Sequence, residues 1–235
     1  MRPYIIINGV LSTNIKGLLI STLPPISKPK VRVSLEEIDG RDGDIATVLG
    51  YAAYDKVFNI GLYGDYIIDD VIKFFDSSGK VIFSNEDDKF YNFAIYDAID
   101  FDKLIRFKTA TVKMHVQPFK FAADEPPIAY YMNTNTLNVR NSGNIYAKPT
   151  IKLIGTGAVS LTVNDAPPII INLSDINETI IIDTQAMNAY DLDGNFKNRE
   201  VIGDYKNLQL NAGSNIITID GNVTRIDVNH YSRWI

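Results

Sequence analysis

The sequence contains no cysteine, so it forms neither disulfides nor thiolate-based metal sites. It has no apolar run approaching the roughly 20 residues that a membrane-spanning helix requires. The apolar run near its amino end, residues 5–7, is too short for a signal peptide. We therefore expect a protein that folds in a cytoplasm, does not insert into membranes and is stabilised by packing.

Charge and composition disfavour two further classes. The chain carries 23 Lys and Arg against 28 Asp and Glu, a net charge of −5, whereas dedicated nucleic-acid binders usually carry a basic stripe. The hydrophobic fraction is 46% and the charged fraction 22%, with 13 Tyr and 11 Phe. That material is sufficient for a packed core and argues against disorder.

Motifs for catalysis or cofactor binding are missing. The two histidines, His115 and His230, are far apart, fit no metal-ligand spacing and are expected at a surface or an interface. No nucleophile elbow and no glycine-rich phosphate loop occurs. We therefore predict that the protein is not an enzyme and has no catalytic residue and no cofactor.

Acidic clusters leave a hydrolase as a minor alternative, because paired carboxylates can catalyse glycoside hydrolysis. Each cluster borders a predicted turn, where acidic side chains are usually solvated or cap a backbone amide. The clusters are Glu36-Glu37, Glu86-Asp87-Asp88, and the group Asp97, Asp100 and Asp102.

One short segment resembles a calcium-binding loop. Asp191-Leu192-Asp193-Gly194-Asn195 has the D-x-D-G core, but the first ligand position falls on Ala189, which offers no side-chain ligand. An Asp-Gly turn between strands is the favoured interpretation. We predict no metal site, and a structural Ca²⁺ near Asp191 and Asp193 stays an open alternative.

Strand patterns dominate the first half of the chain. Residues 31–35 alternate apolar and polar side chains, and residues 57–62, 80–83 and 90–96 are rich in aromatic and β-branched types. Residues 65–75 instead place apolar side chains at helical spacing, which predicts one α-helix. The sequence therefore predicts a mainly β domain that contains a single helix.

The longest strand pattern runs from Ile105 to Phe121. One face carries alternate residues from Phe107 to Phe121, and the other face carries Ala110, Val112, Met114 and Val116. A strand of this length predicts an extended β-hairpin or arm that reaches beyond its own domain.

A domain boundary is expected at Asp124-Glu125-Pro126-Pro127, because consecutive prolines stop both helices and strand ladders. We therefore expect domains over residues 1–126 and 127–235, with the last strand able to return to the first domain. The second half has short strand candidates separated by turn residues, and Gly155-Thr156-Gly157 is one expected hairpin turn. This spacing favours a β-sandwich. The candidates are residues 136–140, 150–154, 158–163, 168–173, 179–183, 215–219 and 223–228.

Aromatic side chains of the second half favour, as an alternative, a module that binds host cell-wall sugars. Sugar rings stack on exposed aromatic rings, although such residues more often fill a core or a subunit contact. The candidate sugar contacts are Tyr190, Tyr205 and Trp234.

Collinear segments resemble a known family. They include Ile7-Asn8-Gly9, Leu23-Pro24-Pro25-Ile26, Gly40-Arg41-Asp42-Gly43 and Gln117-Pro118-Phe119-Lys120, with looser matches such as Leu210-Asn211-Ala212-Gly213. In this order they resemble the distal tail protein (Dit) family of siphophages that infect Gram-positive bacteria, over nearly the whole chain and most specifically in the first half.

The resemblance implies a structural protein of the virion tail tip. It implies a homohexameric ring, built by the first domain, that abuts the tail tube protein on one side and the baseplate hub or tail-associated lysin on the other. DNA passes through the lumen of such a ring, and a receptor-binding protein is a further possible partner. The second domain would be a galectin-like β-sandwich facing outward.

Two details follow from the resemblance. The long strand is the candidate inter-subunit arm, since pairing with a neighbour satisfies an exposed strand edge; its residues are Arg106, Phe107, Thr109, Lys113, His115 and Phe119. The ordered His, Asn, Arg and Trp set of galectin sugar sites is missing, because the only Trp is Trp234 at the end of the chain.

Overall fold

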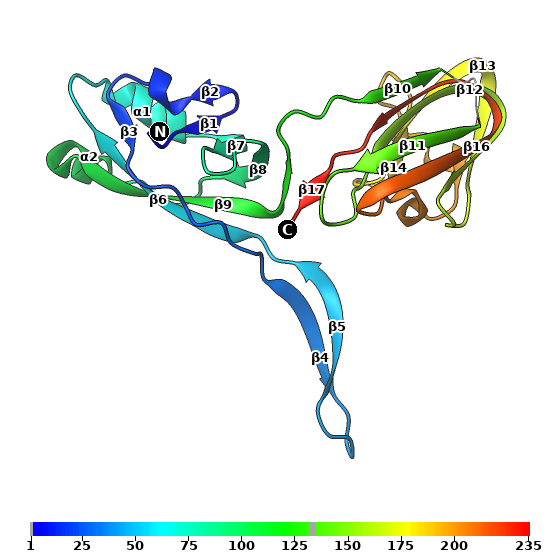
Figure 1. Cartoon of the computed structure of the whole chain (residues 1–235), viewed down its shortest axis with the longest axis horizontal. Helices are drawn as coiled ribbons and strands as arrows, with labels where there is room; N and C mark the ends of the chain where they lie inside the picture. Colours follow the sequence, from blue (N-terminus) through cyan, green and yellow to red (C-terminus); the bar gives the residue numbers. More distant parts are fainter. Residues whose placement is uncertain (1, 132–134) are drawn as a thin grey trace. The chain divides into compact units, whose positions relative to one another are not determined.

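The computed structural model describes residues 2–131 and 135–235. The chain divides into two compact units (Figure 1). The first extends to Ala123 and also takes in Ile235, and the second covers Asp124–Trp234. No helix among the described residues is long and apolar enough to cross a membrane. Each unit has its own hydrophobic core.

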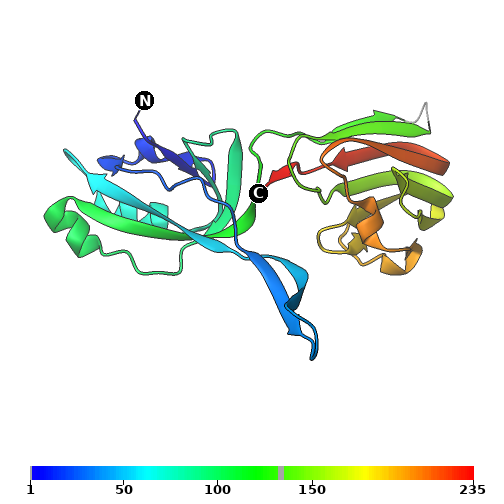
Figure 2. The ribbon, with the colours of Figure 1, turned by 60° about the horizontal axis from the view of Figure 1, so that its bottom comes forward.

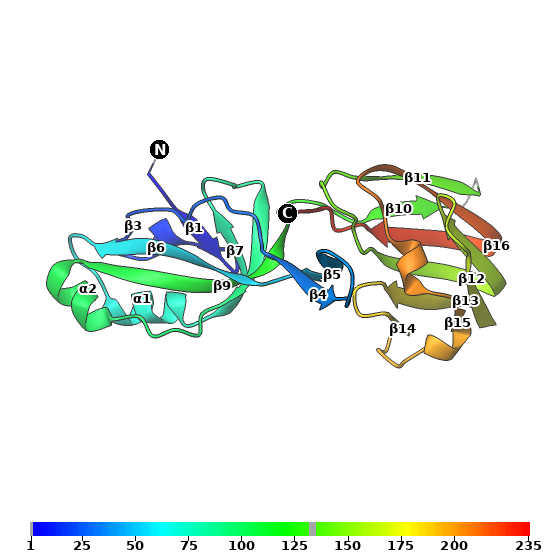
Figure 3. The same ribbon diagram turned by 90° about the horizontal axis from the view of Figure 1, so that it is seen from below.

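The first unit is built on an antiparallel sheet with the strand order β2-β1-β7-β8-β9-β6-β3. Between β8 and β6 lies β9, whose buried Ala110, Val112, Met114 and Val116 alternate with more exposed residues, as predicted. Figure 3 shows β6 and β9 side by side. The strands are β1 (Ile5–Ile7), β2 (Val10–Leu11), β3 (Leu18–Ile20), β6 (Tyr54–Leu62), β7 (Ser78–Phe83), β8 (Lys89–Ala94) and β9 (Thr109–Ala122).

Two α-helices and a short 3-10 helix, η1 (Ser12–Asn14), complete the first unit. The predicted helix is confirmed as α1 (Ile68–Phe75), which buries Val71, Phe74 and Phe75. A second helix, α2 (Phe101–Phe107), was not predicted. Its N-cap is Asp100, whose side chain accepts a hydrogen bond from the amide of Lys103 at 2.8 Å. The prediction of strand from Ile105 is therefore wrong for residues 105–107, because the capped helix extends to Phe107.

A separate two-stranded ribbon lies between β3 and β6 in the sequence. It consists of β4 (Val31–Glu37) and β5 (Asp44–Tyr51), which pair with each other and with no other strand among the described residues. The turn between them contains Gly40 and Gly43, both at positive φ, as the two glycines predict. Figures 1 and 2 show the ribbon, in blue and cyan, extending away from the sheet of its own unit.

The second unit is one antiparallel sheet that curls around a single core. Its strand order is β10-β16-β12-β13-β14, with β11 also paired to β16 and β15 to β13 (Figure 3). The elements are β10 (Ile128–Tyr131), β11 (Thr136–Asn141), β12 (Thr150–Val163), β13 (Ile169–Asp183), β14 (Asn188–Tyr190), β15 (Val201–Ile202), β16 (Gly213–Asn229), β17 (Arg233–Trp234), and the 3-10 helices η2 (Asn198–Glu200) and η3 (Tyr205–Leu208).

Long bent strands replace the predicted short ones in this unit. The expected strand pairs 150–154 and 158–163, 168–173 and 179–183, and 215–219 and 223–228 are each one continuous strand, β12, β13 and β16. The predicted hairpin turn at Gly155–Gly157 is wrong, since these residues form a bend with a shift of register inside β12. A side chain at Gly155 would lie 2.6 Å from the carbonyl oxygen of Asn222, so the bend requires glycine.

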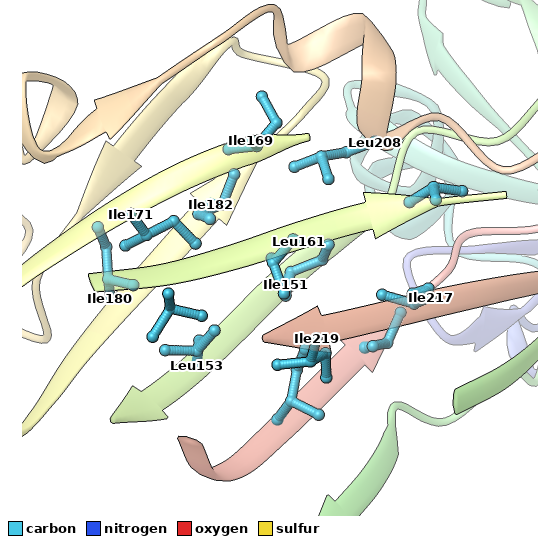
Figure 4. Packing of buried hydrophobic residues seen from close by; sticks show 14 of the residues in the cluster. Ile151, Leu153, Leu161, Ile169, Ile171, Ile180, Ile182, Leu208, Ile217 and Ile219 are labelled. Carbon is cyan, nitrogen blue, oxygen red and sulfur yellow. The ribbon is translucent and has the colours of Figure 1, made fainter. Parts of the chain in front are cut away.

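The bends bring both halves of these strands around the same core (Figure 4). Apolar side chains from the two halves of β12, such as Leu153 and Leu161, pack with Ile171, Ile182 and Ile219 from β13 and β16. The sandwich predicted from the sequence is therefore present, but its layers are joined through continuous strands.

Candidate functional site

The ribbon β4–β5 has one apolar and one mainly polar face. Its register pairs Val33 with Val48 and Leu35 with Ala46 on one face. The intervening pairs, which include Ser34 with Thr47, lie on the opposite face because side chains alternate along a strand. The apolar face thus carries Val31, Val33, Leu35, Ala46, Val48 and Tyr51 and ends near the turn in the acidic pair Glu37 and Asp44, whereas the opposite face carries Arg32, Ser34, Glu36, Ile45, Thr47 and Gly50.

The apolar face of the ribbon is open to solvent. The exposed fractions are 47% for Val33, 60% for Leu35 and 66% for Val48. Isolated single apolar side chains are common on protein surfaces, but a contiguous apolar face indicates a contact with another molecule. A two-stranded ribbon by itself is also only marginally stable in water, so a covering partner would stabilise it.

The root of the ribbon is fixed to the sheet of the first unit. The ring of Tyr51 meets the ring of Phe119 edge to face, with 5.3 Å between centroids. Phe119, one of the predicted arm residues, is half-buried in β9. It therefore lies where the ribbon starts.

The structure places the other predicted arm residues on two elements. Arg106 and Phe107 lie in α2, and 71% of Phe107 is exposed. Thr109, Lys113 and His115 lie on the outward face of β9. β9 pairs with β6 over residues 109–116 and with β8 over residues 115–122, so it is part of the sheet of its own unit, and its role as an inter-subunit arm stays a prediction. The free hairpin is the ribbon β4–β5.

Charged groups form a network on the outward face of β9. The Nδ1 atom of His115 lies 2.8 Å from Oδ1 of Asp55, and Nζ of Lys113 lies 3.0 Å from carboxylate oxygens of both Asp55 and Asp97. Hydrogen bonds from His115 and then Lys113 hold the pKa of Asp55 below its ordinary value. The network is exposed, as in a solvated face or a polar interface.

In the acidic cluster of residues 86–88, Asp87 and Asp88 are exposed as predicted, but Glu86 is not solvated. Its side chain is nearly buried, with Oε1 2.7 Å from Nζ of Lys120 and Oε2 accepting a hydrogen bond of 2.7 Å from the hydroxyl of Tyr91. Burial, followed by the hydrogen bond to Glu86, raises the pKa of Tyr91 strongly. Both oxygens of Glu86 thus serve structural hydrogen bonds.

His230 is buried, although the sequence placed it at a surface or interface. Its Nε2 atom lies 3.0 Å from Oε1 of Glu125. Burial alone would raise the pKa of Glu125, but hydrogen bonds from His230 and Ser232 hold it below its ordinary value. This pair joins the first residues of the second unit to its last ones.

Two of the three predicted sugar contacts lie close together. Tyr190 forms an isolated β-bridge with Phe196, and their rings are 5.4 Å apart between centroids. Tyr205 packs against the core, and Tyr190 contributes to raising its pKa after the larger effect of burial. Phe196 is 69% exposed and was not predicted, although its position directly after the Asp-Gly turn could have indicated it. Trp234 lies elsewhere in the sequence, in β17.

The segment resembling a calcium loop is a turn held by its own aspartate. The carboxylate of Asp191 accepts hydrogen bonds of 2.9 Å from the amides of Asp193 and Asn195 and from the side chain of Asn195. These bonds, led by that of the Asn195 side chain, lower the pKa of Asp191. The described residues contain no group of three or more His, Cys, Asp or Glu side chains placed to hold a metal ion.

Comparison with known proteins gives a likeness of fold. No protein-family model matches the chain, and no curated sequence matches it significantly. The solved structure of the SPP1 Dit protein (gp 19.1) matches with a TM-score of 0.69 and 15% identity, covering 98% of this chain and 100% of that one. That protein is described as a paradigm of the hub adsorption apparatus in phages that infect Gram-positive bacteria.

A chain of the phage p2 baseplate in its activated conformation also matches over 98% of both chains. Its TM-score of 0.45 and identity of 8% are too low to support an inference. The resemblance stated from the sequence is confirmed for the fold: the protein is mainly β and has the fold of the SPP1 Dit protein.

Proposed function

We propose that this protein is a structural component of a phage tail tip. Six copies form a ring through their first domains, residues 1–126, and the second domains, residues 127–235, face outward. The ring joins the tail tube protein to the baseplate hub or tail-associated lysin, and DNA passes through its lumen. The fold shared with the SPP1 Dit protein supports the class of function, and the open apolar face of the ribbon supports assembly.

The ribbon β4–β5 serves as the inter-subunit arm in this proposal, in place of the strand predicted from the sequence. Its apolar face, with Val33, Leu35 and Val48, would be covered by a neighbouring subunit. A contact between an arm and a different surface of the next copy is heterologous, and such contacts close into a ring when the rotation fits. β9 is paired within its own unit by β6 over residues 109–116 and by β8 over residues 115–122, and its outward residues Thr109, Lys113 and His115 are candidates for polar contacts with a neighbour.

We expect no catalytic activity. The carboxylate of Glu86 accepts hydrogen bonds from Lys120 and Tyr91, and the side chain of Asp100 caps α2. The hydrolase alternative rested on three acidic clusters, and at two of them a carboxylate thus has a structural role. The proposed scaffold role requires no reaction.

Light scattering coupled to size exclusion tests the ring. The expected mass at high protein concentration is six times that of the 26.3 kDa chain, and electron microscopy should show closed rings. A strict monomer at every concentration would contradict the proposal. Co-sedimentation with the tail tube protein and with the hub of the same particle tests the two axial partners, and a receptor-binding protein can be tested in the same way.

A sugar-binding module is the second candidate, favoured by the exposed ring of Phe196, which contacts the half-buried ring of Tyr190. Sugars stack on such rings, and each contact can be removed singly. A glycan array probes the intact protein, and Phe196→Ala should lose any signal that this site produces. Tyr96→Ala is the matched control, since Tyr96 is similarly exposed in the first unit. No binding on the array, or binding unchanged in Phe196→Ala, would contradict a sugar site here.

A further inference from the structure

The segment that leads into the ribbon forms few backbone–backbone hydrogen bonds with neighbouring segments. This strap, residues 21–30, contains Pro24, Pro25 and Pro29, which have no amide hydrogen to donate. At its start the amides of Ser21 and Thr22 bond to the carbonyl of Asn59, and at its end the carbonyl of Lys30 accepts a hydrogen bond of 2.8 Å from the amide of Ala52. Its middle must be held by other groups.

Three side chains of the sheet hold the middle of the strap through its carbonyl oxygens. Asn85 donates to the carbonyl of Pro24 at 3.1 Å, the ammonium of Lys56 donates to that of Pro25 at 3.0 Å, and the hydroxyl of Tyr54 donates to that of Ser27 at 3.3 Å. The donors come from β6 and from the turn after β7. Side chains thus replace the ladder that the prolines prevent.

Lys56 is the most constrained of the three. It is 2% exposed, and its ammonium lies over the rings of Tyr91 at 4.6 Å, Phe83 at 5.6 Å and Tyr54 at 5.7 Å from their centroids. Rings facing a cation attract it, and this attraction strengthens where water is excluded. The three rings therefore hold the ammonium of Lys56 in a position from which it can donate to the strap.

The charged groups facing Lys56 do not neutralise it. Glu86 attracts the ammonium and Lys120 repels it, but the oxygens of Glu86 are bonded to Lys120 and Tyr91. Among the described residues Lys56 forms no ion pair within 4.0 Å. Its hydrogen bond to the carbonyl of Pro25 is thus the polar contact that the structure gives this ammonium.

A buried ammonium without an ion pair costs stability, and an apolar side chain of similar length would avoid that cost. Burial lowers the pKa of Lys56 to about 8, which agrees with such a cost. A lysine at this position is therefore not explained by the stability of the sheet alone. Its hydrogen bond to the strap is the interaction that an apolar side chain could not replace.

We propose that Lys56 is a positioning residue, whose caged ammonium holds the strap against the sheet and thereby orients the ribbon β4–β5. The inference rests on the proposed function where it takes the ribbon as the inter-subunit arm. The holding of the strap itself is independent of any assembly.

Hydrogen exchange of the intact protein tests the inference with Lys56→Met, which keeps the length of the side chain and removes its charge. The amides of Thr22 and Ala52 bracket the strap, and they should exchange at least about fivefold faster at pH 7, as loss of a charged hydrogen bond predicts. The amide of Ala147, bonded to Leu210 in the second unit, is the internal reference and should not change. Thermal unfolding should occur at the same or a higher temperature.

Two further variants separate positioning from general support. Tyr54→Phe removes the donor to Ser27 and should also speed exchange at Ala52, with no loss of global stability. Lys120→Met removes a buried lysine whose contact is Glu86 rather than the strap, and should lower stability without selective exchange at Thr22 and Ala52. The Lys56→Arg variant should retain part of the protection, because it retains a cationic donor.

Unchanged exchange at Thr22 and Ala52 in Lys56→Met would overturn the inference. So would a Lys56→Met protein that fails to fold, since Lys56 would then support the sheet itself. Light scattering of the same variant reports separately on the ring. Faster exchange with an unchanged sixfold mass would keep the strap inference and contradict the role of the ribbon in assembly.

Discussion

Replacing the apolar face of the ribbon tests the proposed assembly most directly. The variant Val33→Thr, Leu35→Thr, Val48→Thr places a β-branched side chain, which suits strands, at all three positions and removes much of the apolar area. These three side chains are 47%, 60% and 66% exposed in the single chain. Their replacement should therefore change the free energy of unfolding of the chain by less than about 1 kcal/mol, as for other surface positions.

The same replacement should strongly weaken a contact that covers this face. Fully burying a Val or Leu side chain stabilises by about 1.5–3 kcal/mol, so covering the exposed half to two thirds of each contributes about 1–2 kcal/mol. Threonine retains part of this area, which leaves a loss of about 2–4 kcal/mol per interface for the three positions. Since about 1.4 kcal/mol corresponds to a factor of ten, each interface should weaken by roughly 30- to 1,000-fold.

Sedimentation velocity over a wide range of concentration measures this effect. The parent protein should sediment as a hexamer and the variant mainly as a monomer with an unchanged circular dichroism spectrum. The control variant Ser34→Thr, Glu36→Gln, Thr47→Ser changes the same number of residues on the polar face and should assemble like the parent. If the apolar-face variant assembles at the same concentrations as the parent, the ribbon does not carry the contact.

Three further predictions concern stability. The free energy of unfolding should rise by about 2 kcal/mol between pH 8 and pH 9.5, because Lys56 loses its proton near pH 8 in the folded chain but only near pH 10.5 in the unfolded chain. The free energy of unfolding should fall again above pH 10, where Tyr91 ionises only in the unfolded chain. Urea titrations at each pH measure both changes, and a rise that persists in Lys56→Met would exclude Lys56 as its cause. Gly221→Ala should destabilise the second unit by about 3 kcal/mol, since the residue has a φ of +117° and its new Cβ would lie 2.5 Å from the carbonyl oxygen of Ala158. Hydrogen exchange of the amides in β12 and β16 measures this loss, and unchanged protection would show that the bend tolerates a side chain. Asp100→Ala should cost the first unit about 1 kcal/mol through loss of the α2 cap, whereas Asp102→Ala, at an uncapped position of the same turn, should cost less by the same denaturation assay.

Local patterns in the sequence determined the class of the fold and several of its parts. The alternation in residues 109–116 predicted which side chains of β9 are buried, since a strand turns successive side chains to opposite faces. The stripe in residues 65–75 predicted α1, because its apolar residues share one helical face. The glycines of residues 40–43 predicted the turn of the ribbon. These features depend on neighbours in the sequence.

Pairing between distant segments was decided only by the tertiary structure. Residues 31–35 were recognised as a strand, but nothing local shows that this strand and β5 pair only with each other and leave an apolar face open. The length of the pattern at 105–121 predicted a projecting arm, but the pattern alone does not show that β9 pairs with β6 over residues 109–116 and with β8 over residues 115–122. The strands β12, β13 and β16 continue through the turn residues that predicted breaks, because Gly155 and Gly221 relieve close backbone contacts in β12 and β16, and Asn177 takes a positive φ in β13.

The burial of polar groups was likewise decided by the tertiary structure and not by local sequence. The sequence predicted a solvated carboxylate at Glu86 and gave no indication of a buried lysine at position 56, since burial of a charged group depends on which distant segments surround it. The sequence by itself determined a mainly β protein with two cores and a tail-protein resemblance. The tertiary structure decided which hairpin is free and which lysine anchors it, because strand pairing and desolvation arise from contacts between residues far apart in the chain.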